Sequence, residues 1–178
     1  MAPVVFPIQE EALSGILESD QIRELSSGYL GSGFAQDGYE FKTVEIRGKT
    51  ASAVAQMTSY GISPTDPAGY HLSVNTAFLM IGQLIVIHGH KFCGFSKKEV
   101  EVWVREYSVV HRQPVRDPKN IAVSVTLEGF RRGIRSDKLG FVYSGRVNKR
   151  AITAKGTAFF DFSAKKPSED FMRLAGLK

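Results

Sequence analysis

The chain has 178 residues, of which 43% are hydrophobic and 23% charged, and this excludes the low-hydropathy composition of a disordered protein. Its length is typical of one domain, so we expect a single domain over residues 1–178. One cysteine, Cys93, excludes a disulfide within the chain, and the net charge of +5 is compatible with a nucleic acid, an anionic membrane surface or a phosphorylated ligand.

The first part of the chain shows no export signal. Glu10 and Glu11 stand where a signal peptide has apolar residues, and a lone thiol suits a reducing compartment, so we predict a cytoplasmic protein. Residues 7–18 place apolar side chains at helical spacing, which predicts a short amphipathic helix. The glycines of residues 28–38 do not follow a strand, so we interpret this segment as a loop rather than a dinucleotide-binding fingerprint.

A β-hairpin is predicted next, with strands at residues 39–46 and 50–57 and a turn at 47–49. Ala51, Ala53 and Ala55 share one face of the second strand because side chains alternate with a period of two. Their small side chains leave room for a bulky neighbour, either a helix or an acyl chain.

The most apolar run of the chain lies in residues 69–90. Its apolar centre, residues 72–87, is shorter than the roughly twenty residues that cross a bilayer, and Asn75 and Gln83 interrupt it. We therefore predict no membrane span but a buried central helix over about residues 72–88, with Gly89 as its C-cap.

The remainder of the chain has the alternation of β-strands. Residues 100–104, 141–147 and 155–162 show it, and so do Ile121, Val123, Val125 and Leu127; a polar tail is expected over residues 164–178. One apolar helix between an early hairpin and several antiparallel strands predicts an α+β hot-dog fold, in which a curled antiparallel sheet wraps around the central helix. Since the other side of such a helix also needs cover, we expect a second subunit.

Three stretches resemble a known family: "PIQEEALSGILE" near the start, "TSY" at residues 58–60, and the pattern H-x11-QL from His71 to Leu84. On these the chain resembles the mycobacterial long-chain acyl-CoA thioesterase family known as FcoT, within the hot-dog thioesterase and dehydratase superfamily. The resemblance implies a fatty acyl thioester substrate, carried on coenzyme A or an acyl carrier protein, and assembly as a homodimer or higher homo-oligomer.

The family's site residues are a tyrosine before the helix and asparagines in it. Tyr60 matches the tyrosine, whereas Gly82, beside the matching Gln83, stands in the place of one asparagine. Ser73, two residues before Asn75, stands in the place of another. The chain therefore departs from the family at two site positions.

Thioester hydrolysis needs a polarised carbonyl, a positioned water and a base. Unpaired N–H groups at a helix N-terminus polarise a carbonyl, and residues 73–76 supply them. No Asp or Glu occurs in residues 71–90, which excludes a carboxylate base on this helix. An imidazole titrates near neutrality, so His71 is the candidate general base, with Tyr60 orienting the carbonyl or the water. The predicted catalytic residues are Tyr60, His71 and Asn75, and the predicted substrate-binding residues include Ser73, Thr76, Gly82 and Gln83.

Each of these residues also has a structural interpretation. Tyr60 can end a strand with its hydroxyl in solvent, and His71 or Asn75 can cap the helix. Gln83 is either a hydrogen-bonding strut or, as we prefer, a pocket wall. Asp66, the nearest carboxylate, is interpreted as a turn former.

The remaining histidines and the cysteine give no sign of a metal or cofactor. His88 and His90 are two residues apart, so they point in different directions on a helix, and we expect them to interact with its C-terminal dipole. Cys93 has no activating partner at a recognisable spacing and is interpreted as structural. We predict no metal site and no cofactor.

Seven basic residues and one acid, Asp137, occur in residues 131–150. This run is either a solvated hairpin end or a docking surface for coenzyme A phosphates or the acidic face of a carrier protein. Arg131, Arg132 and Arg135 are the first choices for substrate binding. No RNA-binding motif accompanies the aromatic residues nearby, which argues against nucleic acid.

Two alternatives to hydrolysis stay open. Dehydration is disfavoured because "HLSVNTAF" lacks the prolines and the acid of hot-dog dehydratases, but other chemistry at the α,β-carbons of a carrier-bound acyl chain is compatible with the sequence. The second alternative is a non-catalytic protein that binds acyl chains or acyl carriers.

Overall fold

The computed structural model describes residues 37–62, 66–95, 97–132, 138–169 and 171. The helix predicted at residues 7–18 lies outside these residues, as does most of the loop predicted at 28–38. In the described part of the chain, no helix is both long enough and apolar enough to cross a lipid bilayer.

The predicted hairpin is confirmed. Strand β1 (Gly38–Arg47) pairs with β2 (Thr50–Ser59) in antiparallel register, with Arg47 opposite Thr50. The turn requires Gly48, whose φ of 55° lies in the left-handed region that glycine adopts without strain. The alanine face of β2 is covered by helix α3, which packs on this strand. Ala51, Ala53 and Ala55 are therefore at most 5% exposed.

Helix α3 (Val74–Phe92) begins and ends later than the sequence predicted. Gly89 is not its C-cap but lies inside the helix, where a Cβ atom would stand 2.3 Å from the ring of Phe160. Glycine at this position therefore lets the helix approach the sheet. The helix ends at Cys93 and Gly94, and the N–H groups of Gly94 and Phe95 donate to the carbonyls of Lys91 and His90. This is a Schellman ending, with Gly94 at φ 80°.

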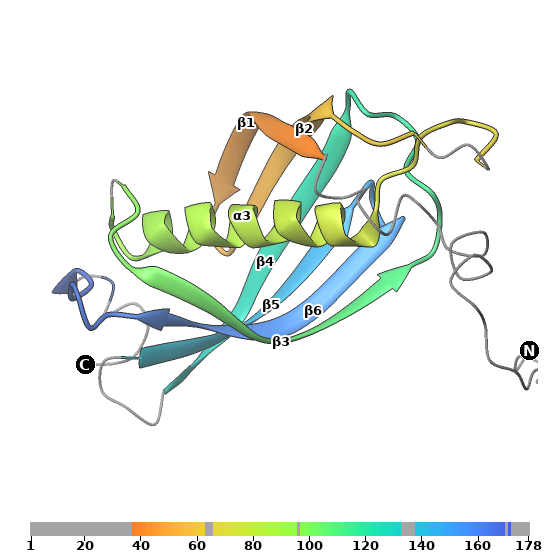
Figure 1. The fold of residues 1–178 in the computed structure, drawn as a ribbon. Coiled ribbons are helices and arrows are strands. Elements are labelled where there is room, and N and C mark those ends of the chain that lie inside the picture. The colour runs from red at the N-terminus through yellow and green to blue at the C-terminus, as the bar shows by residue number, and fades with distance from the viewer. Residues whose placement is uncertain (1–36, 63–65, 96, 133–137, 170, 172–178) are drawn as a thin grey trace, which may run out of the picture.

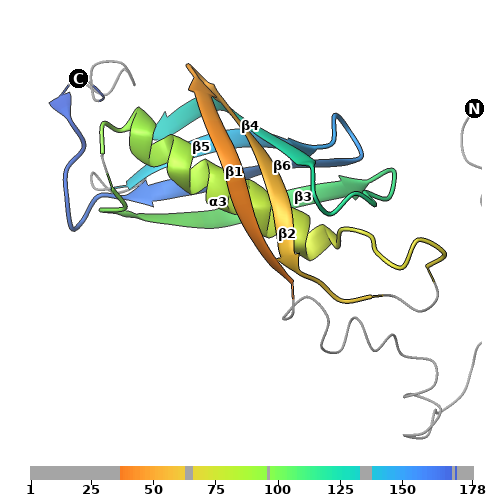
Figure 2. The same cartoon turned by 90° about the horizontal axis from the view of Figure 1, so that it is seen from above.

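Four more antiparallel strands complete the sheet: β3 (Glu101–His111), β4 (Ile121–Arg132), β5 (Lys138–Val147) and β6 (Ile152–Asp161). The strand order is β1-β2-β4-β5-β6-β3, which puts β1 and β3 at the two edges. The predicted alternation in β4 is confirmed, since Ile121, Val123, Val125 and Leu127 are all buried. Figure 1 and Figure 2 show the strands curving around one long helix, an arrangement consistent with the predicted hot-dog fold.

The C-terminal segment is not wholly a polar tail. Phe171 is 1% exposed, and its ring contacts those of Phe92, Phe130 and Phe162. This aromatic cluster joins the end of α3 to the end of β4. It extends the core to the end of the helix opposite to the candidate site.

Candidate functional site

The first turn of α3 is held by a chain of hydroxyl groups that ends on a carboxylate. Ser73 is the N-cap, and its Oγ accepts a hydrogen bond from the N–H of Thr76 at 3.0 Å. The Ser73 hydroxyl donates to Thr76 Oγ1 at 2.8 Å, and the Thr76 hydroxyl donates to Asp37 Oδ2 at 2.5 Å. Asp37 also accepts a hydrogen bond from the N–H of Gly61 at 3.4 Å. The helix start is therefore tied to the segments that precede β1 and follow β2.

This network revises the predicted roles of Ser73, Thr76, His71 and Asn75. The cap is Ser73, and neither His71 nor Asn75 fills that role. The hydroxyls of Ser73 and Thr76 bond to each other, and that of Thr76 bonds to Asp37, so the remaining donors at the helix start are the backbone N–H groups of Val74 and Asn75. Neither has a hydrogen-bond partner among the residues that the structure describes.

Asp37 is a site residue that the sequence reasoning missed. It brings a carboxylate to the positive end of a helix that has none of its own in the first turn. The contact joins residues 39 positions apart, so no local pattern reveals it. The available signal was a single acid between a glycine-rich segment and the first strand.

His71 lies two residues before the N-cap and is paired with Asp66. His71 Nδ1 donates to Asp66 Oδ2 at 2.8 Å, and the guanidinium of Arg116 stands 3.6 Å from the other carboxylate oxygen. The His71 side chain is 32% exposed and that of Asp66 is 11% exposed. In the neutral ring that donates from Nδ1 to this carboxylate, Nε2 is the atom with the basic lone pair.

Asp66 combines the predicted structural role with a second one. It is a turn former, because its side chain accepts a hydrogen bond from the N–H of Ala68 and its carbonyl one from the N–H of Gly69. The Ala68 hydrogen bond, the bond from His71 and the charge of Arg116 lower the pKa of Asp66. The carboxylate is therefore ionised at neutral pH and orients the His71 ring, a role beyond the turn former that the sequence indicated.

Tyr60 lies at the same end of the molecule. Its ring centroid is 4.5 Å from that of Tyr70, which is buried and directly precedes His71. Tyr60 itself is 39% exposed. The structure thus brings Tyr60 and His71 to one end of α3, together with Ser73 and Thr76.

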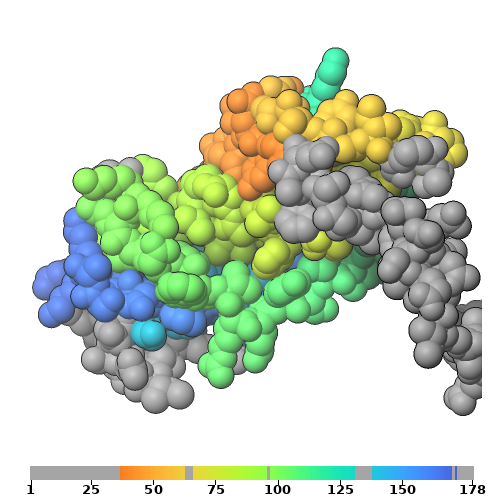
Figure 3. Space-filling model, in the orientation of Figure 1, coloured from red at the N-terminus to blue at the C-terminus, as the bar shows by residue number. Residues whose placement is uncertain are grey.

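Asn75, Leu79 and Gln83 are exposed on the outer side of α3, and Gly82 beside them is half-buried. Gln83 is therefore not in a buried part of the helix, because the described residues leave one stripe of α3 uncovered. Figure 3 shows this helical surface exposed between the hairpin β1–β2 and the edge strand β3.

The basic run of residues 131–150 does not form one surface. Arg131 and Arg132 end β4 just beyond Phe130, whose ring contacts Phe92 at the C-terminal end of α3. Arg135 lies outside the described residues. Arg146 and Lys149 stand at the other end of β5, a strand of ten residues that is about 33 Å long. Of the predicted docking residues, Arg131 and Arg132 are therefore remote from the helix N-terminus.

A different group of cations surrounds the candidate site. The N–H of Leu72 donates to the carbonyl of Val115, and the N–H of Arg112 donates to that of Ala151. The first bond places the β3–β4 connection beside the segment that leads into α3, and the second joins the β5–β6 turn to the start of that connection. The exposed basic residues of these two segments are Arg112, Arg116, Lys119, Lys149 and Arg150.

Both histidines near the helix end are buried. His88 Nε2 donates to the carbonyl of Gly48 at 2.9 Å, and burial lowers the pKa of His88. His90 Nδ1 donates to the carbonyl of Val86 at 2.7 Å. Burial raises the pKa of the Cys93 thiol to about 12, so the thiol is protonated, as expected of a structural cysteine. The described residues contain no cluster of His, Cys, Asp or Glu that could hold a metal ion.

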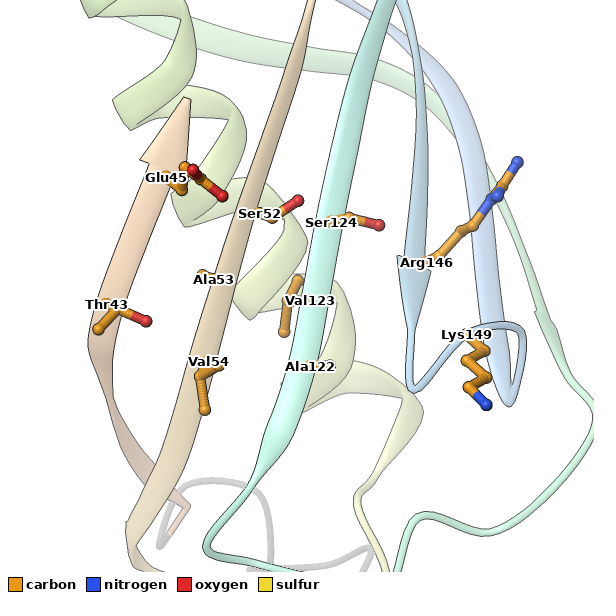
Figure 4. Close-up of a pocket in the computed structure, with 10 residues that line it drawn as sticks. All are labelled: Thr43, Glu45, Ser52, Ala53, Val54, Ala122, Val123, Ser124, Arg146 and Lys149. Atoms are coloured by element: carbon orange, nitrogen blue, oxygen red, sulfur yellow. The ribbon is translucent and has the colours of Figure 1, made fainter. Parts of the chain in front are cut away.

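A shallow hollow of about 290 Å³ lies on the outer face of the sheet, the side opposite to α3. Figure 4 shows Ser52 and Ser124 on its floor and Arg146 and Lys149 on its rim. It contains none of the residues predicted to be catalytic, and it is separated from His71 by the sheet.

No family model matches the chain, and no curated protein matches it. Solved structures that resemble it include a thioesterase from Haemophilus influenzae, at 11% identity over 82% of this chain and 92% of that one, with a TM-score of 0.43. A hypothetical thioesterase from Streptococcus pneumoniae, solved with coenzyme A, matches at 10% identity over 72% and 91%, with a TM-score of 0.45. A mutant thioesterase from Pseudomonas aeruginosa matches at 10% identity over 70% and 81%, with a TM-score of 0.44. At this distance the likeness does not identify the activity of the chain.

Proposed function

We propose that the protein hydrolyses fatty acyl thioesters at the N-terminal end of α3, with His71 as the general base. One observation carries the proposal: a histidine oriented by a carboxylate, at 2.8 Å, lies directly before a helix whose first two N–H groups have no partner in the described part of the chain. A base and a group of N–H donors are the two elements that acyl transfer to water requires.

In the proposed reaction, His71 Nε2 removes a proton from a water molecule as its oxygen attacks the thioester carbonyl carbon. The N–H groups of Val74 and Asn75 stabilise the negative charge on the carbonyl oxygen. Asp66 stabilises the imidazolium that forms. When the tetrahedral intermediate collapses, the carbon–sulfur bond breaks and the imidazolium returns the proton to the sulfur, which leaves a free fatty acid and a thiol.

The other predicted residues have supporting roles in this proposal. Tyr60, held against Tyr70, forms a wall beside the carbonyl and has a hydroxyl that can orient the water. The exposed Asn75 side chain lies in the first turn, where it can bond the thioester or the arm that carries it. Gly82 and Gln83 lie along the outer stripe of the helix, where the substrate or a second subunit would cover them.

The carrier of the acyl group is proposed to bind at Arg112, Arg116, Lys149 and Arg150. These side chains can bind either carrier, because both the phosphates of coenzyme A and the acidic face of an acyl carrier protein are negatively charged. These four cations lie at the end of the molecule that contains His71, whereas Arg131 and Arg132 lie at the opposite end. Substitution of Arg112 and Arg116 is therefore expected to raise KM more than substitution of Arg131 and Arg132.

A second copy of the chain is proposed to cover the outer face of α3. Leu79 is 50% exposed, and on the adjacent edge strand Trp103 and Tyr107 are 54% and 59% exposed. Apolar side chains of this size, gathered between a helix and a sheet edge, are typical of an interface. Light scattering tests this proposal: a dimer that dissociates in Leu79→Asp supports it, and a wild-type monomer contradicts it.

The test of the function is incubation with a long-chain acyl-CoA, followed by measurement of free thiol and of bound ligand. Thiol release that falls at least tenfold, about 1.4 kcal/mol of barrier, in both Tyr60→Phe and His71→Ala supports hydrolysis at this site. Binding without thiol release would instead favour the acyl-binding alternative. Loss or gain of an α,β double bond without thiol release would favour the other chemistry.

A further inference from the structure

Tyr143 has a buried hydroxyl group that lacks a hydrogen-bond partner among the described residues. Its side chain lies on the inner face of β5 and is 0% exposed. Gly156 of β6 makes room for it, because a Cβ atom there would stand 2.7 Å from the Tyr143 hydroxyl and 2.2 Å from the carbonyl oxygen of Glu106. Among the described residues this hydroxyl makes no hydrogen bond.

An unpaired buried hydroxyl costs about 1–3 kcal/mol relative to a paired one. Phenylalanine would fill the same space without that cost, so packing alone does not account for tyrosine at this position. Burial raises the pKa of Tyr143, and the hydroxyl is therefore protonated and able to donate. A buried donor without a partner calls for a specific explanation, and a ligand atom is one.

The hydroxyl lies at the boundary between α3 and the edge strand β3. Gly156 is paired with Tyr107 of β3 on one side and with Tyr143 of β5 on the other, so the two tyrosines lie in one row across the sheet with only the glycine between them. The Tyr107 ring stacks on that of Phe78 in α3, with centroids 4.2 Å apart, and Tyr107 is mostly exposed. A bulge between Val104 and Glu106 interrupts the pairing of β3 with β6 at this level.

This position is close to the proposed reaction centre. Phe78 is five residues after the N-cap Ser73, which corresponds to about 7.5 Å along the helix. An apolar surface lies between the helix N-terminus and the Tyr143 hydroxyl. It is formed by Phe78, Leu79 and Tyr107. Figure 1 shows β3 running along α3 over this part of the helix.

We infer that the Tyr143 hydroxyl recognises an oxygen substituent, a hydroxyl or keto group, on the acyl chain close to the thioester. The inference rests on the proposed function and specifies its substrate class. The acyl chain lies between α3 and β3 with the Tyr107 ring turned aside, and Tyr143 donates a hydrogen bond to the oxygen of the substituent. The pantetheine arm of the carrier also has acceptor oxygens, but these are shared by every substrate and would give no preference between acyl chains.

The test compares a 3-hydroxyacyl-CoA with the unsubstituted acyl-CoA of the same chain length. For wild type, Tyr143→Phe and Tyr39→Phe, the measured quantity is the ratio of kcat/KM for the two substrates. The structure predicts a wild-type preference for the hydroxylated chain and a roughly tenfold fall of the ratio in Tyr143→Phe, the effect of one hydrogen bond. Tyr39→Phe, a half-buried tyrosine of β1, controls for the substitution and keeps the wild-type ratio.

Urea unfolding of Tyr143→Phe is part of the test, because the variant should be as stable as wild type or more stable. A clear loss of stability would show that the hydroxyl has a structural partner, and the inference would then be wrong. An equal effect of Tyr143→Phe on both substrates, or no effect on either, would also overturn it. If wild type hydrolyses neither substrate, the proposed function fails, and the ratio of the two dissociation constants then decides the inference by the same criterion.

Discussion

Replacing Gly89 by alanine should destabilise the protein, although alanine is the better helix former. The added Cβ would stand 2.3 Å from Cζ and 2.6 Å from Cε1 of Phe160, closer than atoms pack. The Phe160 ring cannot move aside easily, since it is fully buried and stacked on Phe141 at 4.8 Å and on Phe162 at 5.6 Å. Overpacking of this kind costs about 3 kcal/mol, the upper part of its usual range.

The helix propensity of alanine returns about 1 kcal/mol, so the expected net loss for Gly89→Ala is about 2 kcal/mol. Gly82→Ala is the matched control, because it lies in the same helix and its Cβ would meet nothing within 4 Å. This variant should gain about 1 kcal/mol. The two variants should therefore differ by about 3 kcal/mol in unfolding free energy, or by roughly 6–12 °C in Tm.

Urea unfolding followed by circular dichroism measures this difference. Several protein concentrations separate an effect of Gly82→Ala on association from its effect on the helix. If Gly89→Ala is as stable as Gly82→Ala at all concentrations, then α3 does not lie against Phe160, and the account of the core is wrong.

Three further predictions concern the cap, the carboxylate and the thiol. Ser73→Ala should lose about 1 kcal/mol of unfolding free energy because the N–H of Thr76 loses its acceptor, whereas Ser52→Ala on the outer face should change it by less than about 0.5 kcal/mol; equal effects in urea unfolding would refute the cap. The pKa of Asp66 is lowered in the folded state, so the stability that the ionised carboxylate contributes is complete above about pH 4 and is lost as the pH falls further. Asp66→Asn should therefore flatten this part of the pH–stability curve. An unchanged curve would contradict the pairing of Asp66 with His71. The Cys93 thiol, with a pKa raised to about 12, should react with iodoacetamide at pH 8 only after unfolding; rapid labelling of the native protein, detected by mass spectrometry, would disprove its burial.

Local alternation predicted the inner strands β2, β4 and β5 because each of them follows it independently of its neighbours. The inward residues of β4 and the alanines of β2 are examples, since a period of two fixes their face whatever strand lies beside them. The end of α3 could not be predicted in this way. Gly89 and Gly94 both lie near the end of the apolar run, and only the position of Phe160, on a strand 71 residues after Gly89, shows which glycine serves packing and which ends the helix.

The candidate site was predicted only in part, because local sequence reveals neighbours along the chain but not contacts between distant segments. Tyr60, His71, Ser73 and Thr76 are near one another because the chain enters the helix there, and sequence proximity reveals this. Asp37 reaches Thr76 from the segment that precedes β1, and the pairing of His71 with Asp66 depends on the path of a loop, so neither follows from spacing. The basic run misled the prediction because strand β5 separates its two ends, which a count of charges does not show.

The central claim is that His71, oriented by Asp66, removes a proton from the water that attacks a thioester bound at the start of α3. The most direct measurement is the single-turnover rate of thiol release from a long-chain acyl-CoA by wild type and by His71→Gln, at enzyme concentrations that bind all of the substrate. The account predicts release by wild type and a loss of about 100-fold or more in His71→Gln, with binding of the acyl-CoA retained. Equal rates for the two proteins, or no release by wild type, would contradict it.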